Sequence, residues 1–233
     1  MITLIKKELS YYLNNPVGYV ILVLFAVFAN FLYMKDVFVT GSGSMRAFFG
    51  VLPWLILIFV PAISMRIFSE EKRTNTIETL LTLPISEFQI VIAKFVSLVI
   101  VYSIGIGLTL CIPFALKFMA NIYIPEVLIA YIGTIFFASS FLSISIFFSS
   151  LTRNQVVAFL SSIITLFILV SFSTDFLATI FPKSIQDFFG FISPLNHFEN
   201  FVKGVVDIRS VFYFVSLSAV FLFLTVINVE KRD

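Results

Sequence analysis

The sequence predicts an all-α integral membrane protein with six transmembrane helices. Hydrophobic residues make up 60% of its 233 residues, charged residues only 12%, and the mean hydropathy is +1.08. This composition is typical of membrane proteins, and several apolar runs reach the ~20 residues that a helix needs to cross a bilayer. The net charge of +2 gives no reason to expect a nucleic-acid partner, and the single cysteine excludes an intrachain disulfide.

The first fifteen residues are expected to form an amphipathic helix in the membrane interface. Its apolar positions are Leu4, Ile5, Leu9, Tyr12 and Leu13, and its polar positions are Lys6, Lys7, Glu8 and Asn14. Pro16 and Gly18 follow, and these residue types break a helix and turn the chain. The first apolar run begins directly after them, so we expect it to be an uncleaved span.

The whole chain is expected to form one transmembrane domain. Its six predicted spans are residues 17–34, 47–68, 87–116, 126–151, 155–175 and 210–229. Pro53 and Pro61 lie inside the second span, where neighbouring helices must accommodate them. The third span is longer than a bilayer requires, and Gly105, Gly107 and Pro113 are expected to loosen it.

Small hydroxyl residues are frequent in the fourth predicted span. Ser139 with Ser143, and Ser145 with Ser149, form pairs four residues apart. Small residues at this spacing allow two helices to approach closely inside a membrane. A polar pathway is the alternative, but tight packing between helices is the favoured interpretation.

A charge-rich stretch, residues 65–94, separates the second and third spans. It contains Arg66, Glu70, Glu71, Lys72, Arg73, Glu78, Glu87 and Lys94. Within it, Asn75 and Glu78 resemble a capping box, and Ile77, Leu80 and Leu81 form one apolar stripe at helical spacing. Pro84 is expected to end this short helix, and Ser86 with Gln89 forms a second capping box that opens the third span. A solvated loop with an interfacial helix is the alternative.

Residues 176–209 are too polar and too broken to span a membrane, yet they are rich in Phe. Pro182 is expected to begin one short helix, and Asn196 with Glu199 resembles the cap of another. Apolar residues then recur with helical periodicity at Phe198, Phe201, Val202, Val205 and Val206. We expect two short helices folded into the outer leaflet before the last span.

Six spans would place both ends of the chain on one side of the membrane. With both termini cytoplasmic, nine of the 15 Lys and Arg residues are on the inside and six on the outside. This bias agrees in direction with the positive-inside rule.

The sequence offers no catalytic, metal-binding or cofactor-binding constellation. It has no GxxxxGK[ST] loop for nucleotide phosphates, and its Gly105-Ile106-Gly107 lies in an apolar span with no strand before it. The only histidine, His197, is more typical of a solvated side chain than of a ligand. No carboxylate lies in the middle of a span, although ion-coupled carriers usually need one. Energy for any transport would therefore come from a partner, and an intramembrane hydrolase would lack its nucleophile and base.

The charge-rich stretch resembles the signature of ABC-2 type transporter permeases. SEEKRTNTIETLLTLPISEFQIVIAKF, residues 69–95, carries the Glu-Glu-Lys/Arg run, the Thr-x-Glu-x-Leu-Leu helix and the Pro-Ile-Ser turn of that family. Asn75 stands where the family usually has Gly, and Asn tolerates both a cap and a left-handed backbone. KKELSYYLNNPVGYVI (residues 6–21) and SPLNHFENFVKGVVDIRSVFYF (residues 193–214) resemble the gliding-motility-associated (Gld-type) permease branch of Bacteroidetes.

The resemblance implies a type V exporter-like fold in the bacterial cytoplasmic (inner) membrane. Two permease subunits, identical or paired with a related protein, would assemble with two ATP-binding-cassette ATPase subunits, which would hold ATP and Mg; this chain would bind no cofactor. Residues 76–83 would be the coupling helix, seated in a cleft of the ATPase, and the first helix would be the connecting helix. The implied ATPase-coupling residues are Glu70, Glu71, Arg73, Thr76, Ile77, Glu78, Leu80 and Leu81. Those of the outer-leaflet helix are Asn196, Phe198, Phe201 and Val202.

The expected function is that of a non-catalytic membrane subunit. It would couple ATP hydrolysis by a separate subunit to export, or to a process linked to gliding motility or secretion. One alternative is a permease for another substrate, such as a metal-centre maturation factor, a lipid or a drug. Another is a membrane anchor of a cell-surface machine that transports nothing.

Overall fold

The structure is a computed structural model that describes residues 1–41, 44–81, 85–117, 123–172 and 190–231. The regular elements of these ranges are all α-helices. They are α1 (Ile2–Asn14), α2 (Pro16–Thr40), α3 (Met45–Ser64), α4 (Arg66–Arg73), α5 (Thr76–Leu81), α6 (Glu87–Leu108), α7 (Cys111–Leu116), α8 (Ile124–Leu151), α9 (Gln155–Ser171), α12 (Pro194–Val202) and α13 (Ile208–Glu230).

Five helical segments of the described chain are long and apolar enough to cross a membrane. They are Pro16–Val39, Met45–Arg73, Glu87–Leu116, Ile124–Leu151 and Ile208–Glu230, and they correspond to five of the six predicted spans. The remaining prediction, residues 155–175, corresponds to α9, an apolar helix of 17 residues. At 1.5 Å per residue α9 is about 25 Å long, somewhat less than the ~30 Å hydrocarbon core. The sixth span therefore stays a prediction.

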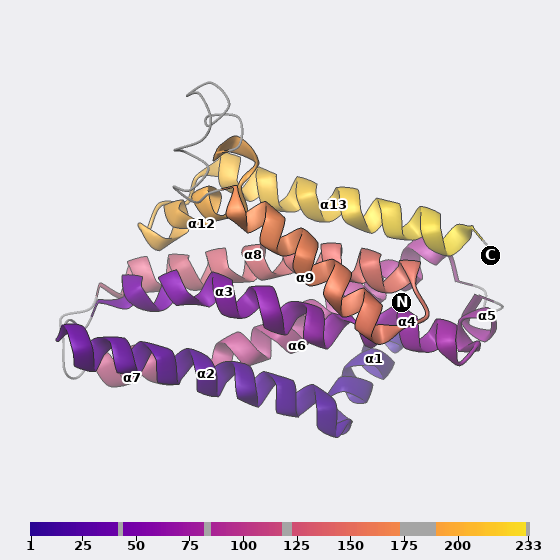
Figure 1. Cartoon of the computed structure of the whole chain (residues 1–233), viewed down its shortest axis with the longest axis horizontal. Helices are drawn as coiled ribbons and strands as arrows, with labels where there is room; N and C mark the ends of the chain where they lie inside the picture. The colour runs from indigo at the N-terminus through magenta and orange to yellow at the C-terminus, as the bar shows by residue number, and fades with distance from the viewer. Residues whose placement is uncertain (42–43, 82–84, 118–122, 173–189, 232–233) are drawn as a thin grey trace.

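The long helices run roughly along one axis, with α8 in the middle of the bundle (Figure 1). Helix α8 contacts α3, α4, α6, α9, α12 and α13. In the most apolar stretch of α8, 67% is buried inside the bundle. The corresponding share for α13 is 28%, so one face of α13 is open. Most serines of α8 are buried, so its small residues serve close packing, as the sequence predicted.

The two ends of the bundle carry different elements. The short helix α5 lies at the same end as both termini, whereas α7 and α12 lie at the opposite end (Figure 1). At that opposite end the Nε of Arg46 lies 2.9 Å from Oε1 of Glu126, which joins the start of α3 to the start of α8.

The third predicted span is divided into two helices. Helix α6 ends at Leu108 and α7 begins at Cys111, with Thr109 between them. The Thr109 hydroxyl lies 2.6 Å from the carbonyl of Ile106 and 3.1 Å from the hydroxyl of Tyr131. The break thus occurs where Gly105 and Gly107 were expected to loosen the span, and a hydroxyl side chain holds it.

Helix α12 differs from the predicted outer helix in both of its ends. It begins at Pro194 after the N-cap Ser193, so Asn196 lies inside it and donates a hydrogen bond to the carbonyl of Gly190 at 3.0 Å. It ends at Val202, because Gly204 has a φ of 76° and closes the helix with a Schellman pattern of hydrogen bonds, Gly204 N–H to Phe201 O and Val205 N–H to Asn200 O. The predicted stripe therefore stops short of Val205, which is 56% exposed. The first predicted outer helix, with Pro182, lies outside the described residues.

Candidate functional site

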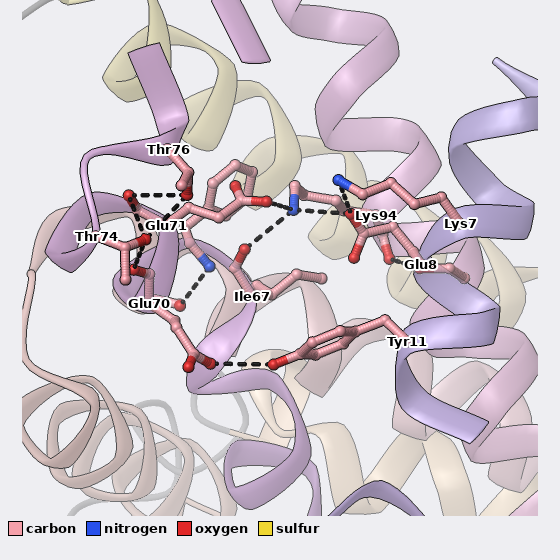
Figure 2. A network of polar contacts seen from close by, with 12 residues as sticks. Lys7, Glu8, Tyr11, Ile67, Glu70, Glu71, Thr74, Thr76 and Lys94 are labelled. Carbon is pink, nitrogen blue, oxygen red and sulfur yellow. Dashed lines mark hydrogen bonds and ion pairs between the residues drawn. The ribbon is translucent and has the colours of Figure 1, made fainter. Parts of the chain in front are cut away.

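Three charged side chains from three helices meet in the interior at the α5 end of the bundle. Lys94 of α6 lies with its Nζ 3.2 Å from Oε1 of Glu8 in α1 and 2.7 Å from Oε1 of Glu71 in α4 (Figure 2). The Lys94 side chain is 1% exposed, and those of Glu8 and Glu71 are 7% and 19% exposed. We call these three residues the buried ion cluster. It joins Lys94 to residues that are 86 and 23 positions away in the sequence.

The ammonium group of Lys94 has a full set of partners. Its third acceptor is the carbonyl of Ile67 at 3.1 Å, so three acceptors match its three N–H donors. The Nζ also lies 5.2 Å from the centroid of the Phe68 ring, within the range of a cation–π contact. Because a buried charge without partners is very unfavourable, this arrangement strongly specifies how α1, α4 and α6 are placed.

Each of the three helices presents its charge on its buried face. In α6, Lys94 follows Ile90 and precedes Leu98 at four-residue spacing, and both neighbours are fully buried. In α4, Glu71 follows Ile67 by one turn, and in α1 Glu8 precedes the buried Tyr12 by one turn. Glu8 was expected on the polar face of the first helix; that placement is wrong, because Glu8 pairs with Lys94 and is 5% exposed.

Two tyrosine hydroxyls add further links between α1 and the α3–α4 region. The hydroxyl of Tyr11 donates to Oε2 of Glu70 at 3.2 Å, and that of Tyr12 donates to the carbonyl of Ile63 at 3.3 Å. Burial and the neighbouring Glu70 carboxylate raise the pKa of Tyr11, and burial raises that of Tyr12 well above its ordinary value. Both phenols therefore remain neutral donors over the physiological pH range, and α1 stays attached to α4.

A tight turn joins α4 to α5. Asn75 has a φ of 57°, which is the left-handed conformation that Asn and Gly adopt most readily. Asn tolerates this conformation, as its chemistry predicts, and it is not the extended conformation typical of an N-cap residue. The hydroxyl of Thr74 lies 2.9 Å from the carbonyl of Glu70 and 3.0 Å from the hydroxyl of Thr76, which itself reaches the carbonyl of Glu71 at 3.4 Å (Figure 2). These contacts fix the start of α5 to the end of α4.

Helix α4 is also fastened to the central helix α8. The Ser149 hydroxyl accepts hydrogen bonds from the backbone N–H groups of Phe68 and Ser69, both at 3.2 Å, and donates to the carbonyl of Met65 at 2.8 Å. Met65 is the residue between α3 and α4, where the backbone leaves one helix and enters the next. The serine thus satisfies polar groups that this junction would otherwise bury without partners.

The structure places the predicted ATPase-coupling residues along one continuous segment. Glu70, Glu71 and Arg73 belong to α4, and Thr76, Ile77, Glu78, Leu80 and Leu81 belong to α5. A terminal guanidinium nitrogen of Arg73 lies 4.0 Å from Oε1 of Glu70. Glu78 is exposed, whereas Ile77 is half-buried against the apolar core of the chain itself. The side chains of Leu80 and Leu81, and the expected stop at Pro84, lie outside the described part. The cap expected at Ser86 is confirmed, because its hydroxyl accepts from the N–H of Gln89 at 3.3 Å.

The predicted outer-helix residues lie at the opposite end and do not join this site. Phe198 and Phe201 of α12 are 2% and 0% exposed, and Val202 is half-buried. His197 is not simply solvated: it stacks on the ring of Tyr213 at 4.3 Å between centroids, with Nδ1 3.3 Å from the Ser210 hydroxyl. These contacts join α12 to α13.

Sequence reasoning missed two members of the buried ion cluster, Glu8 and Lys94. One signal was present: Lys94 lies eight residues into an apolar run, and a charge so placed must find a partner. Its partner Glu8 could not be read from a local pattern. Among the residues that the structure describes, no group of three His, Cys, Asp or Glu residues is arranged to hold a metal ion.

A sequence model of the family described as ABC-2 family transporter protein matches residues 3–229, nearly the whole chain. No curated protein matches the sequence.

Proposed function

This chain belongs to the ABC-2 family of transporter proteins, and on this premise we propose that it is a permease subunit driven by a separate ATPase. It would itself hold no nucleotide, with ATP and Mg bound by the ATP-binding-cassette partner. Two permease subunits, identical or related, would assemble with two such ATPases in the bacterial inner membrane. Both termini and α5 would face the cytoplasm, where the ATPase is.

The buried ion cluster is the observation that carries this proposal. Helix α5 has six residues, too few to be stable in isolation, and it is held through the Thr74–Thr76 turn to α4. Helix α4 is in turn held to α6 and α1 by Lys94 and to α8 by Ser149. A partner that displaces α5 would therefore displace several membrane helices together, which is what coupling to an ATPase requires.

The surface of α5 suits a partner cleft in part. Ile77, Leu80 and Leu81 share one side of the helix by their spacing. Ile77 is already half-buried by the chain, so the two leucines would supply most of the apolar contact with the ATPase. The charges of Glu70, Arg73 and Glu78 would set orientation more than affinity.

We further propose that the permease serves a gliding-motility or secretion-linked process. The support is the resemblance of residues 6–21 and 193–214 to the Gld-type branch. A permease for another substrate, such as a metal-centre maturation factor, a lipid or a drug, and a non-transporting anchor of a cell-surface machine are the alternatives. Solute movement into proteoliposomes that is lost when the ATPase is inactivated would exclude the anchor.

The test of coupling is the double variant Leu80→Asp with Leu81→Asp. Burial of two leucines contributes about 3–5 kcal/mol, so the variant should lose the ATPase in a pull-down from mild detergent. Its level in the membrane should stay normal, because α5 lies at the end of the bundle outside the candidate spans. The matched control, Glu78→Ala, alters an exposed residue of the same helix and should retain the ATPase, with a loss of at most about 1 kcal/mol.

Retention of the ATPase at wild-type stoichiometry by a normally inserted double variant would contradict the assignment of α5. Loss of the double variant from the membrane would equally contradict it, because α5 would then be part of the fold rather than a surface for a partner. Equal loss of binding in the Glu78→Ala control would indicate a general disturbance of the helix.

A further inference from the structure

A small, partly open cavity lies between α1, the start of α2 and the end of α3. Arg66, the first residue of α4, lines it together with Tyr11 of α1, Asn15 between α1 and α2, Gly18 of α2 and Ile63 of α3. Its volume is about 10 Å³. A water molecule needs roughly 10–15 Å³ of such space, so the cavity has room for a single oxygen atom. We call it the Arg66 cavity.

The guanidinium group of Arg66 has an N–H donor without an acceptor. Its Nε is shielded from solvent and has no hydrogen-bond partner among the residues that the structure describes. Arg66 also forms no ion pair within that part of the chain. Glu70 lies one turn further along α4, but its carboxylate accepts from the Tyr11 hydroxyl at 3.2 Å instead. Because an unpaired buried donor on a charged group is costly, an acceptor is expected at this Nε.

Close contacts fix the walls of the cavity. The Tyr12 hydroxyl donates to the carbonyl of Ile63 at 3.3 Å, which joins α1 to α3. The Asn15 side chain accepts from the N–H of Val17 at 3.1 Å and caps α2. A Cβ on Gly18 would lie 2.1 Å from the carbonyl oxygen of Tyr12, so the backbones on the two sides of this turn touch. A ligand therefore meets a preformed space and does not have to order it, which favours affinity.

An anion with two oxygens suits this donor better than water does. The Nε–H of an arginine and one of its terminal N–H groups are parallel and bind two oxygens of a phosphate together. One phosphate oxygen would occupy the cavity at Nε, and a second would meet the terminal nitrogen. Water would satisfy Nε alone and leave the charge of Arg66 without a counter-charge. The small volume is no obstacle to a phosphate group, because only one of its oxygens has to enter.

The place of the cavity in the fold indicates which phosphate it meets. It lies where the amphipathic helix α1 joins the candidate span Pro16–Val39. Tyr11, on its rim, is 43% exposed, and tyrosine is typical of the level at which lipid headgroups lie. Basic pockets between membrane helices at this level bind the headgroups of anionic lipids.

We propose that the Arg66 cavity binds a phosphate oxygen of an anionic membrane phospholipid, with Nε and a terminal nitrogen of Arg66 as the donors. A free phosphate ion offers the same chemistry, and a comparison of lipid with inorganic phosphate separates the two sources. No residue of α5 or of the buried ion cluster lines the cavity. The proposal can therefore fail or hold independently of the coupling role of α5.

Binding is measured on the purified full-length chain in detergent by native mass spectrometry. The probes are dioctanoyl-phosphatidylglycerol, the zwitterionic dioctanoyl-phosphatidylcholine and inorganic phosphate, and phosphatidylglycerol should bind most tightly. Arg66→Gln should weaken its binding about tenfold, which corresponds to about 1.4 kcal/mol. Arg66→Lys should recover part of the affinity, because it restores the charge without the parallel pair of N–H donors.

A second variant tests the cavity with the arginine left in place. Ala62, one turn before Arg66, lines the cavity and is half-buried. Ala62→Leu would fill the space for one oxygen atom and should also weaken phosphatidylglycerol binding about tenfold. The matched control for charge is Lys6→Gln, which removes a positive charge from an exposed residue of α1 outside the cavity. It should leave the affinity unchanged.

Four results would overturn the proposal. Equal affinity of the wild-type chain for the two lipids would do so, and this comparison needs no variant, so it stands even if Arg66→Gln does not fold. Equal losses in Lys6→Gln and Arg66→Gln would indicate unspecific surface charge. Full affinity in Arg66→Gln would mean that the cavity holds only water. Inorganic phosphate binding as tightly as phosphatidylglycerol would replace the lipid by a free phosphate ion.

Discussion

Lys94 is the residue on which the arrangement of the α5 end depends most. A buried ion pair is weak support for stability as such, because the desolvation of its charges offsets much of their attraction. What it provides here is position: the three donors of Lys94 are satisfied only when Glu8, Glu71 and the carbonyl of Ile67 converge on one point. Arginine would not replace Lys94, because the planar guanidinium group directs its N–H donors differently from an ammonium group.

Replacement of Lys94 tests this role directly. In Lys94→Met the carboxylates of Glu8 and Glu71 lose their shared partner, and breaking a buried pair typically costs about 3–5 kcal/mol. The free energy of unfolding in detergent, followed by circular dichroism against denaturant, should fall by that amount. Lys7→Met changes a neighbouring lysine that is 64% exposed and should change the free energy by no more than about 0.5 kcal/mol.

A second variant separates lost charge pairing from lost packing. Lys94→Met combined with Glu8→Gln and Glu71→Gln should recover a good part of the stability, because no unpaired carboxylate remains. A single Lys94→Met variant as stable as the wild type would show that the cluster does not position the three helices.

At the scale of residues, the sequence allowed some of these features to be predicted. The left-handed tolerance of Asn75 and the cap at Ser86 follow from local chemistry, and both agree with the structure. The pairing of Glu8 with Lys94 could not be predicted, because the two residues are 86 positions apart and Glu8 looks like an ordinary interfacial charge. Only the tertiary arrangement of α1 shows which face of that helix is covered.

At the scale of elements, the packing of α12 against α8 depends on one glycine, Gly133. A Cβ placed on Gly133 would lie 2.3 Å from Cβ and 2.4 Å from Cγ of Phe201. These are atoms close to the α12 backbone, so a rotamer change cannot relieve the clash and α12 itself would have to move. Phe201 is fully buried and faces Phe214 of α13 at 6.3 Å between ring centroids. The close approach of two backbones thus holds α12 against α8 at the end of the bundle opposite α5.

Gly133→Ala should therefore lower the free energy of unfolding by about 1–3 kcal/mol, the usual effect of overpacking. Gly50→Ala in α3 is the matched control, because its Cβ would meet no atom within 4 Å. That variant should be as stable as the wild type or better by up to about 1 kcal/mol, since Ala favours a helix over Gly. The same denaturant titration measures both variants. Equal stability of the two would contradict the close packing of α12 against α8 at Gly133.

The elements themselves were predictable to different degrees. Composition and run length were enough for five spans, because a helix that satisfies its own backbone is the only solution for a long apolar run in lipid. The end of α12 was missed because the apolar stripe continues to Val205 and Val206 after the helix has stopped. Gly204 was the available signal, since a glycine after a lysine is a common helix end.

At the scale of the whole molecule, the number of crossings decides where α5 and the termini lie. Figure 1 shows both termini and α5 at one end of the bundle, which requires an even number of passages from end to end. Five candidate spans with α9 as the sixth passage satisfy this, although α9 is only about 25 Å long. A short span can be accommodated by local thinning of the bilayer at a modest cost. We therefore expect six crossings with both termini on one side, and the nine-to-six bias of Lys and Arg residues favours the cytoplasmic side.

Accessibility of single cysteines in intact cells tests this topology. With the exposed Cys111 replaced by Ser, cysteines are introduced one at a time at Lys6, Lys203 and Lys231, all of them exposed. A membrane-impermeant thiol reagent should label position 203 from outside, because α12 and the residues after it lie at the end opposite α5. Positions 6 and 231 should react only after the cells are opened. Labelling of 6 and 231 from opposite sides would show that α9 does not cross, and labelling of 6 and 231 from outside with 203 protected would reverse the orientation. Either result would remove α5 from the cytoplasm or from the common end, and with it the contact with an ATPase on which the proposed function depends.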